Sequence, residues 1–179
     1  MKKRFARIYV EITNVCNLHC EFCLESNREK RFMNANEFEK VIEEIADYTN
    51  LIMLHVKGEP LLHPELRKIL EICEKNNIKV NITTNTTLIE KNKVILKNSK
   101  ALRQLNLSIH DLEQNRIDTE NNLNKIIELV DEITDENKDL IISYRLWNLE
   151  NIGQNEKNST EWEKPFSNDT TNKRLIIKK

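Results

Sequence analysis

The chain has 179 residues, and its 28 basic and 29 acidic side chains leave a formal net charge of only −1. This balance gives no electrostatic evidence for binding to nucleic acid or to an anionic membrane surface. No apolar run approaches the ~20 residues that span a bilayer, and the basic N-terminus lacks the apolar region of a secretory signal. We therefore expect a cytoplasmic protein whose four cysteines stay reduced.

Apolar and polar side chains alternate in five segments, which is typical of strands with one apolar face. Between them lie four segments with the apolar spacing of amphipathic helices. Asn34 or Asn36 can cap the first of these helices, and Pro64 suits the first turn of the second. In chain order we expect strand 7–13, helix 36–48, strand 51–59, helix 64–75, strand 79–85, helix 88–97, strand 104–110, helix 121–133 and strand 142–147.

The alternation of strands and helices implies parallel strands joined by right-handed crossovers. Parallel strands that are covered on both faces are usually apolar throughout, but these strands keep one polar face. A sheet that curls would turn this face inward to line a cavity, and sites in such folds lie at the carboxyl ends of the strands. We predict an α/β fold, a partial (βα) barrel of about five βα units; the alternative is an antiparallel sheet with one solvated face.

The pattern predicts one core domain over residues 1–150 and a polar tail after it. Residues 151–179 form a polar tail rich in Asn, Glu, Ser and Thr, for which we expect mostly loop or disorder. The tail ends in RLIIKK, which has the pattern of the start of a sixth strand.

Three of the four cysteines, Cys16, Cys20 and Cys23, lie close together directly after the first predicted strand. In a reducing compartment such a cluster indicates metal binding rather than cross-linking. Structural zinc sites commonly have a second ligand pair, but here only His19 is near, and Cys73 fits the apolar stripe of a helix. Three thiolates suit a 4Fe–4S cluster with one iron left open. A zinc-binding structural module and three unrelated cysteines are the alternatives.

The segment CNLHCEFC resembles the CxxxCxΦC signature of the radical S-adenosylmethionine (radical SAM) superfamily, with Phe22 at the aromatic position. A second resemblance lies at the end of the second predicted strand, where Gly58, Glu59 and Pro60 are similar to the family's GGEP motif. Glycine allows a ligand to approach closely, and a carboxylate can accept hydrogen bonds from an ammonium group. The resemblance implies that this motif binds the amino group of SAM; a simple glycine–proline turn is the alternative.

The later strands resemble the family less specifically. The resemblance implies that Thr83 and Asn85 face SAM. It also implies that Ser108 lies near the SAM methionine or ribose and that Arg145 pairs with the SAM carboxylate. The family often has glycine where this chain has Thr86, and a residue with a Cβ resists positive φ, so we expect a different turn there. For each of these residues, an ordinary polar strand position is the alternative.

Over residues 5–150 the resemblance implies a radical SAM enzyme with an incomplete TIM barrel. In that family three thiolates hold a 4Fe–4S cluster, and SAM binds the open iron. Reductive cleavage of SAM then gives a 5′-deoxyadenosyl radical that abstracts hydrogen from a substrate. The resemblance also implies oxygen sensitivity, an electron donor such as flavodoxin or ferredoxin, and a small-molecule or peptide substrate. Because the usual core has six βα units, a truncated, catalytically inactive remnant that still binds the cluster is the second hypothesis.

Overall fold

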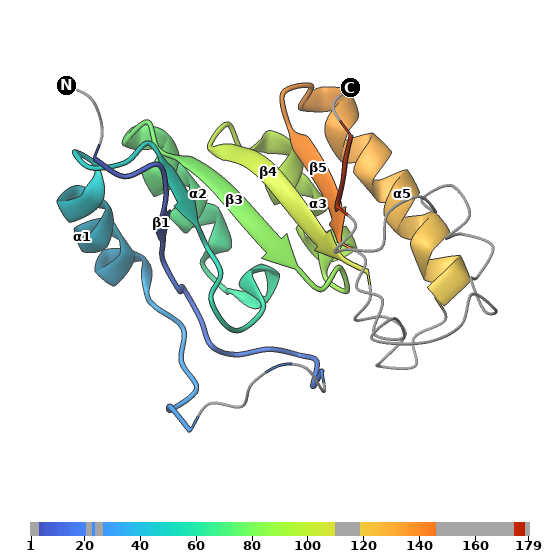
Figure 1. Cartoon of the computed structure of the whole chain (residues 1–179), viewed down its shortest axis with the longest axis horizontal. Coiled ribbons are helices and arrows are strands. Elements are labelled where there is room, and N and C mark those ends of the chain that lie inside the picture. Colours follow the sequence, from blue (N-terminus) through green and yellow to red (C-terminus); the bar gives the residue numbers. More distant parts are fainter. Residues whose placement is uncertain (1–3, 21–22, 24–26, 110–118, 146–173, 178–179) are drawn as a thin grey trace, which may run out of the picture.

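The computed structural model describes residues 4–20, 23, 27–109, 119–145 and 174–177 (Figure 1). One sheet runs through this part of the chain, and its strands lie side by side in sequence order. The strands are β1 (Ile8–Tyr9), β2 (Leu51–Met53), β3 (Lys79–Thr84), β4 (Leu102–Ser108), β5 (Ile141–Arg145) and β6 (Arg174–Ile177). β1 to β5 are parallel, which confirms the predicted α/β class and shows that the antiparallel alternative is wrong.

Helices connect the parallel strands, as crossovers require, and α2 and α3 lie behind the sheet in Figure 1. They are α1 (Ala35–Ile45), the 3₁₀ turn η1 (Pro60–Leu62), α2 (Leu66–Lys75), α3 (Ile89–Asn98) and α5 (Thr119–Glu136). Asn34 caps α1 in a capping box with Glu37. Pro64 lies in the turn between η1 and α2, so it precedes α2 instead of opening it. None of the helices in the described ranges is long and apolar enough to cross a membrane.

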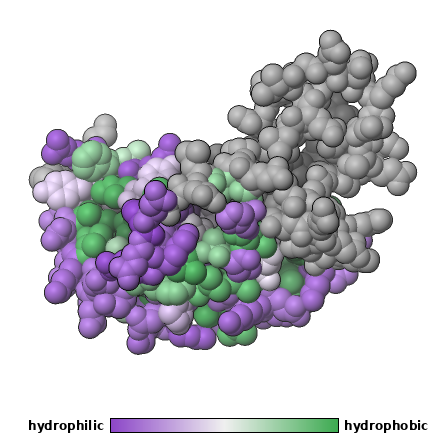
Figure 2. Space-filling model, turned by 90° about the horizontal axis from the view of Figure 1, so that it is seen from below, coloured by the Kyte–Doolittle hydropathy of each residue, from purple (hydrophilic) through white to green (hydrophobic). Residues whose placement is uncertain are grey.

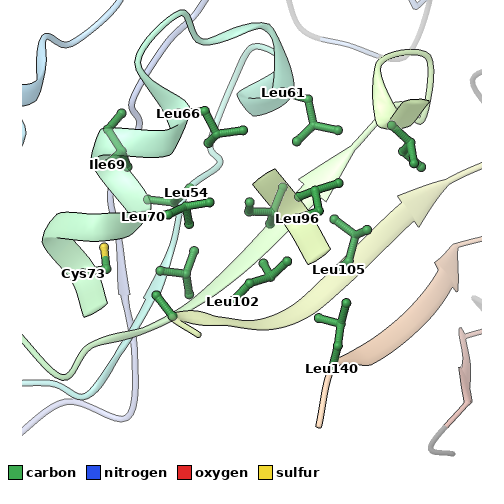
Figure 3. Close-up of a cluster of buried hydrophobic side chains, with 14 of the residues drawn as sticks. Leu54, Leu61, Leu66, Ile69, Leu70, Cys73, Leu96, Leu102, Leu105 and Leu140 are labelled. Atoms are coloured by element: carbon green, nitrogen blue, oxygen red, sulfur yellow. The ribbon is translucent and has the colours of Figure 1, made fainter. Parts of the chain in front are cut away.

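The apolar face of the sheet packs against the helices and forms the core (Figure 3). Val80 on β3 and Leu105 on β4 are fully buried, as the alternation of their strands predicts. Leu66 and Ile69 come from α2 to the same core. Cys73 on α2 is fully buried too, which confirms it as a core residue, and burial raises the pKa of its thiol to about 12.

β1, β2 and β6 differ most from the sequence prediction. β1 contains only Ile8 and Tyr9, although we expected a strand over residues 7–13. β2 ends at Met53, well before Glu59, and the chain then bends over residues 56–58. Val56, predicted on the apolar face of this strand, is therefore 60% exposed. β6 lies within the RLIIKK segment and pairs antiparallel with β5, so it does not extend the parallel pattern.

Candidate cofactor site at the carboxyl ends of the strands

The cysteine-bearing loop follows β1 at the end of the sheet toward which β3 and β4 point (Figure 1). Its two arms are joined at the base, where Thr13 and Phe32 form an antiparallel bridge. The Asn14 side chain also spans the arms, since its Nδ2 donates to the Glu29 carbonyl (2.8 Å) and its Oδ1 accepts the Arg31 N–H (2.8 Å). Figure 2 views the molecule from this side and shows apolar patches among hydrophilic residues. These contacts hold the two arms of the loop together at its base.

None of the three cysteines of this loop forms a disulfide bond. The Cys23 N–H donates to the Cys20 carbonyl (3.0 Å). The Cys16 Sγ accepts two N–H groups, from the Leu18 backbone (3.5 Å) and from Asn85 Nδ2 (3.7 Å). Although Cys16 as a whole residue is exposed, partial burial of its thiol raises the pKa, while these two N–H donors act in the opposite direction.

The donor set of the loop fits a 4Fe–4S cluster. Among the described residues, no three His, Cys, Asp or Glu side chains gather closely enough to hold a single metal ion. The thiolates of a cluster bind different irons, so they need not converge on one point as the ligands of a single zinc ion do. Three reduced thiols in one loop, one of them already receiving N–H donors, are the groups such a cluster uses.

Gly58 lets the segment after β2 pack directly on the cysteine loop. Its φ is +73°, and a Cβ at this position would lie 2.5 Å from the Thr13 carbonyl oxygen and 2.8 Å from that of Val15. The neighbouring Glu59 N–H donates to the Val15 carbonyl (2.8 Å). We expected a ligand to approach closely at this glycine. In the structure, the backbone that leads to Cys16 makes this close approach instead.

The Glu59 side chain is 1% exposed and ties two further segments to this contact. One carboxylate oxygen accepts the Leu61 N–H at the start of η1 (2.8 Å), and the other accepts the Asn85 N–H after β3 (2.7 Å). Pro60 is the first residue of η1 and is buried. Glu59 thus links the carboxyl-end loops of β1, β2 and β3.

Asn85 connects the third loop to the cysteine loop through its side chain. Besides Cys16, its Nδ2 donates to Asn17 Oδ1 (3.0 Å). Its Oδ1 accepts both the backbone N–H (3.2 Å) and the hydroxyl (2.7 Å) of Thr87. Asn17 Nδ2 in turn donates to Thr87 Oγ1 (2.8 Å), so the hydrogen bonds form a closed ring.

The turn after β3 corrects one expectation. Thr86 has φ 72°, the conformation that glycine adopts easily, so its Cβ does not force a different turn. Its N–H is held by the Thr84 hydroxyl (3.1 Å), but its own buried hydroxyl has no hydrogen-bond partner among the described residues. The surrounding network therefore stabilises a strained residue at this position.

A row of polar side chains crosses the other face of the sheet. Thr83, Asn106 and Ser143 lie in register on β3, β4 and β5. Thr83 Oγ1 bonds to His55 Nε2 (3.2 Å) and accepts Asn106 Nδ2 (3.2 Å). We expected this face to line a cavity, yet Asn106 and Ser143 are fully buried. Burial, assisted by the Arg145 charge, lowers the pKa of His55 to about 4, so the ring is neutral at pH 7.

The remaining predicted residues lie at the same end of the sheet or outside the described part. Ser108 and Arg145 end β4 and β5 and are paired in register. Phe22 lies outside the described residues. Sequence reasoning missed Asn17 and Thr87, whose part in the hydrogen-bonded ring depends on contacts between distant loops.

Sequence comparisons point to one family. The model of the family described as the Radical SAM superfamily matches residues 10–155. An uncharacterized protein of Methanocaldococcus jannaschii is 34% identical over 62% of this chain and 40% of its own length. A probable GTP 3′,8-cyclase of Methanococcus maripaludis is 31% identical over 63% of this chain and 40% of its own length. The chain thus spans less than half the length of these relatives.

Solved structures share the fold. Streptococcus suis SuiB bound to S-adenosylmethionine matches with a TM-score of 0.62 and 24% identity, over 76% of this chain and 33% of SuiB. BtrN in complex with AdoMet and 2-DOIA matches with a TM-score of 0.61 and 21% identity, over 79% of this chain and 57% of BtrN. At these identities the likeness concerns the fold alone, and it confirms the predicted partial barrel.

Proposed function

Because the chain belongs to the radical SAM superfamily, we propose that it is part or all of an enzyme whose Cys16, Cys20 and Cys23 hold a 4Fe–4S cluster with SAM on the open iron. When bound, the cluster supplies the electron that cleaves SAM to methionine and a 5′-deoxyadenosyl radical, which abstracts hydrogen from the substrate. The protein's residues hold, orient and shield these groups. The family implies both cofactors.

The observation that carries this proposal is the attachment of the cysteine loop to the carboxyl ends of β2 and β3. The backbone of Thr13 to Val15 packs on Gly58, and Glu59 and Asn85 bond this loop to its neighbours. A cofactor on the three thiols would therefore lie at the end of the sheet where sites of such folds form.

We assign the remaining predicted residues to SAM by their position. The segment of Gly58, Glu59 and Pro60 receives the amino group, and the buried Glu59 contributes by fixing the segment rather than by exposing its carboxylate. Thr83, Asn85, Ser108 and Arg145 come from the carboxyl-terminal parts of the next three strands or directly after them, on the side of the cofactor. From the resemblance of the cysteine motif, Phe22 is also proposed as a cofactor-binding residue, at the aromatic position before Cys23.

The substrate class is inferred from relatives of this chain. Relatives include a probable GTP 3′,8-cyclase, and one structure of SuiB is bound to the precursor peptide SuiA. We propose a small-molecule or peptide substrate and an electron donor such as flavodoxin or ferredoxin.

The test is anaerobic turnover of SAM. Protein loaded with iron and sulfide, then given dithionite and SAM, should form 5′-deoxyadenosine and methionine in equal amounts. Cys20→Ala should abolish both iron loading and product, whereas Cys73→Ala, which removes a core thiol outside the loop, should keep both. Protein that binds a full cluster but forms no 5′-deoxyadenosine would contradict the proposed enzymatic activity and favour the inactive, cluster-binding remnant.

A further inference from the structure

Asn85 is placed to act on the sulfur of Cys16 rather than on SAM alone. Its Nδ2 lies 3.7 Å from the Cys16 Sγ, within the longer range of hydrogen bonds to sulfur. The two residues are 69 positions apart in the chain and meet only because the loops after β1 and β3 are packed together. The Leu18 N–H is a second donor to the same sulfur, at 3.5 Å.

The orientation of this amide is fixed by its neighbours. Thr87 donates twice to Oδ1, which requires the NH₂ end of the side chain to point toward the cysteine loop. Nδ2 has two hydrogens, and its two acceptors are Asn17 Oδ1 and the Cys16 Sγ. The Asn85 backbone N–H is held by the Glu59 carboxylate at 2.7 Å. Because both the side chain and the backbone of Asn85 are held by hydrogen bonds, Nδ2 stays oriented toward the Cys16 Sγ.

We propose that Asn85 is a positioning residue that donates a hydrogen bond to the Cys16 thiolate of the cluster and thereby raises the reduction potential of the cluster. Reduction adds negative charge that is shared by the iron-bound sulfurs. An N–H donor stabilises the reduced state more than the oxidised state, and hydrogen bonds to sulfur are among the factors that set iron–sulfur potentials. The chain would thus ease the electron transfer that precedes cleavage of SAM.

This inference rests on the proposed function, because it needs the cluster. The experiment is an EPR-monitored redox titration of the reconstituted protein without SAM, with iron counted in each sample. In Asn85→Ala the equilibrium constant for one-electron reduction should fall about tenfold, which corresponds to a midpoint about 59 mV more negative. In Asn85→Asp, which keeps the acceptor for Thr87 but removes the donor, the midpoint should fall at least as far.

The sign of the shift separates a hydrogen bond from a merely structural role. A loosened loop would admit water, and water stabilises the more negative reduced cluster, so the potential would rise. Asn92→Ala is the matched control, because Asn92 is also buried but donates to the carbonyls of Leu61 and Leu88. It should leave the midpoint unchanged even if it lowers stability.

Thr87→Val keeps Asn85 but removes the hydroxyl that anchors its Oδ1, and it should lower the midpoint by a smaller amount. If Asn85→Ala fails to fold, Thr87→Val still tests the inference. Midpoints of the Asn85 variants and of Thr87→Val that equal the wild type, or rise above it, at equal iron content would overturn the inference and leave the proposed function intact. A wild-type protein that holds no 4Fe–4S cluster would overturn both.

Discussion

Replacing Gly58 with alanine should destabilise the protein and loosen the cysteine loop at the same time. The added Cβ would lie 2.5 Å from the Thr13 carbonyl oxygen and 2.8 Å from that of Val15. Both are backbone atoms, so no side-chain rotation can relieve the contact. The chain must move the segment that leads directly to Cys16, or move Gly58 away from it.

The magnitude follows from two contributions. A left-handed backbone costs a residue with a Cβ roughly 1–2 kcal/mol. Moving the segments apart also breaks the hydrogen bond from Glu59 N–H to the Val15 carbonyl, which contributes about 1 kcal/mol. A total of about 2–3 kcal/mol should lower Tm by roughly 4–12 °C for a chain of this length.

Urea unfolding and iron content after anaerobic reconstitution measure the two effects. We expect an earlier unfolding midpoint and less iron per chain in Gly58→Ala. An alanine variant that unfolds at the wild-type urea concentration and binds the full complement of iron would refute the argument, because it would show that the backbone contact at Gly58 can be relieved at no cost.

Three further predictions concern residues near the same site. Thr86→Gly should raise the free energy of unfolding by about 0.5–1 kcal/mol, since it relieves φ 72° and removes a buried hydroxyl that has no partner in the described part of the chain. Asn77→Gly, at φ 55°, should change the free energy less, because Asn tolerates this conformation. Equal effects of the two substitutions would argue against strain at Thr86. Glu59→Gln should lower the free energy of unfolding, measured in urea, by about 2 kcal/mol, because an amide can accept only one of the two backbone N–H groups at full strength. An unchanged free energy would mean that the carboxylate does not hold these loops. With its pKa lowered from 6.5 to about 4, His55 binds fewer protons in the folded than in the unfolded state, so stability should fall by about 2 kcal/mol between pH 7.5 and pH 5. His55→Asn should flatten this part of the pH profile, and an unchanged slope would exclude His55 as its cause.

Local pattern was enough to predict the elements that build the sheet. Val80, Ile82, Leu105 and Leu107 alternate with polar residues, and all four are buried against the helices. Such alternation is a property of neighbouring residues in the chain, so it can be read without knowing the fold. The same is true of the apolar stripe that carries Cys73.

Contacts between distant loops could not be predicted in the same way. Nothing near Asn85 in the sequence indicates that its amide meets Cys16, or that Thr87 and Asn17 complete the ring. The direction of β6 depends on how the chain returns to β5, which four strand residues do not encode. Val56 shows the limit of periodicity itself, because alternation continued past the point where backbone pairing ended.

The most direct test of the account is EPR of the anaerobically reconstituted, dithionite-reduced protein with and without SAM. Three thiolates and an open iron predict a 4Fe–4S signal that changes when SAM is added. Two results would contradict the assignment of Cys16, Cys20 and Cys23 to a SAM-binding cluster. One is protein that retains zinc and forms no iron–sulfur cluster. The other is a cluster whose EPR signal does not change when SAM is added.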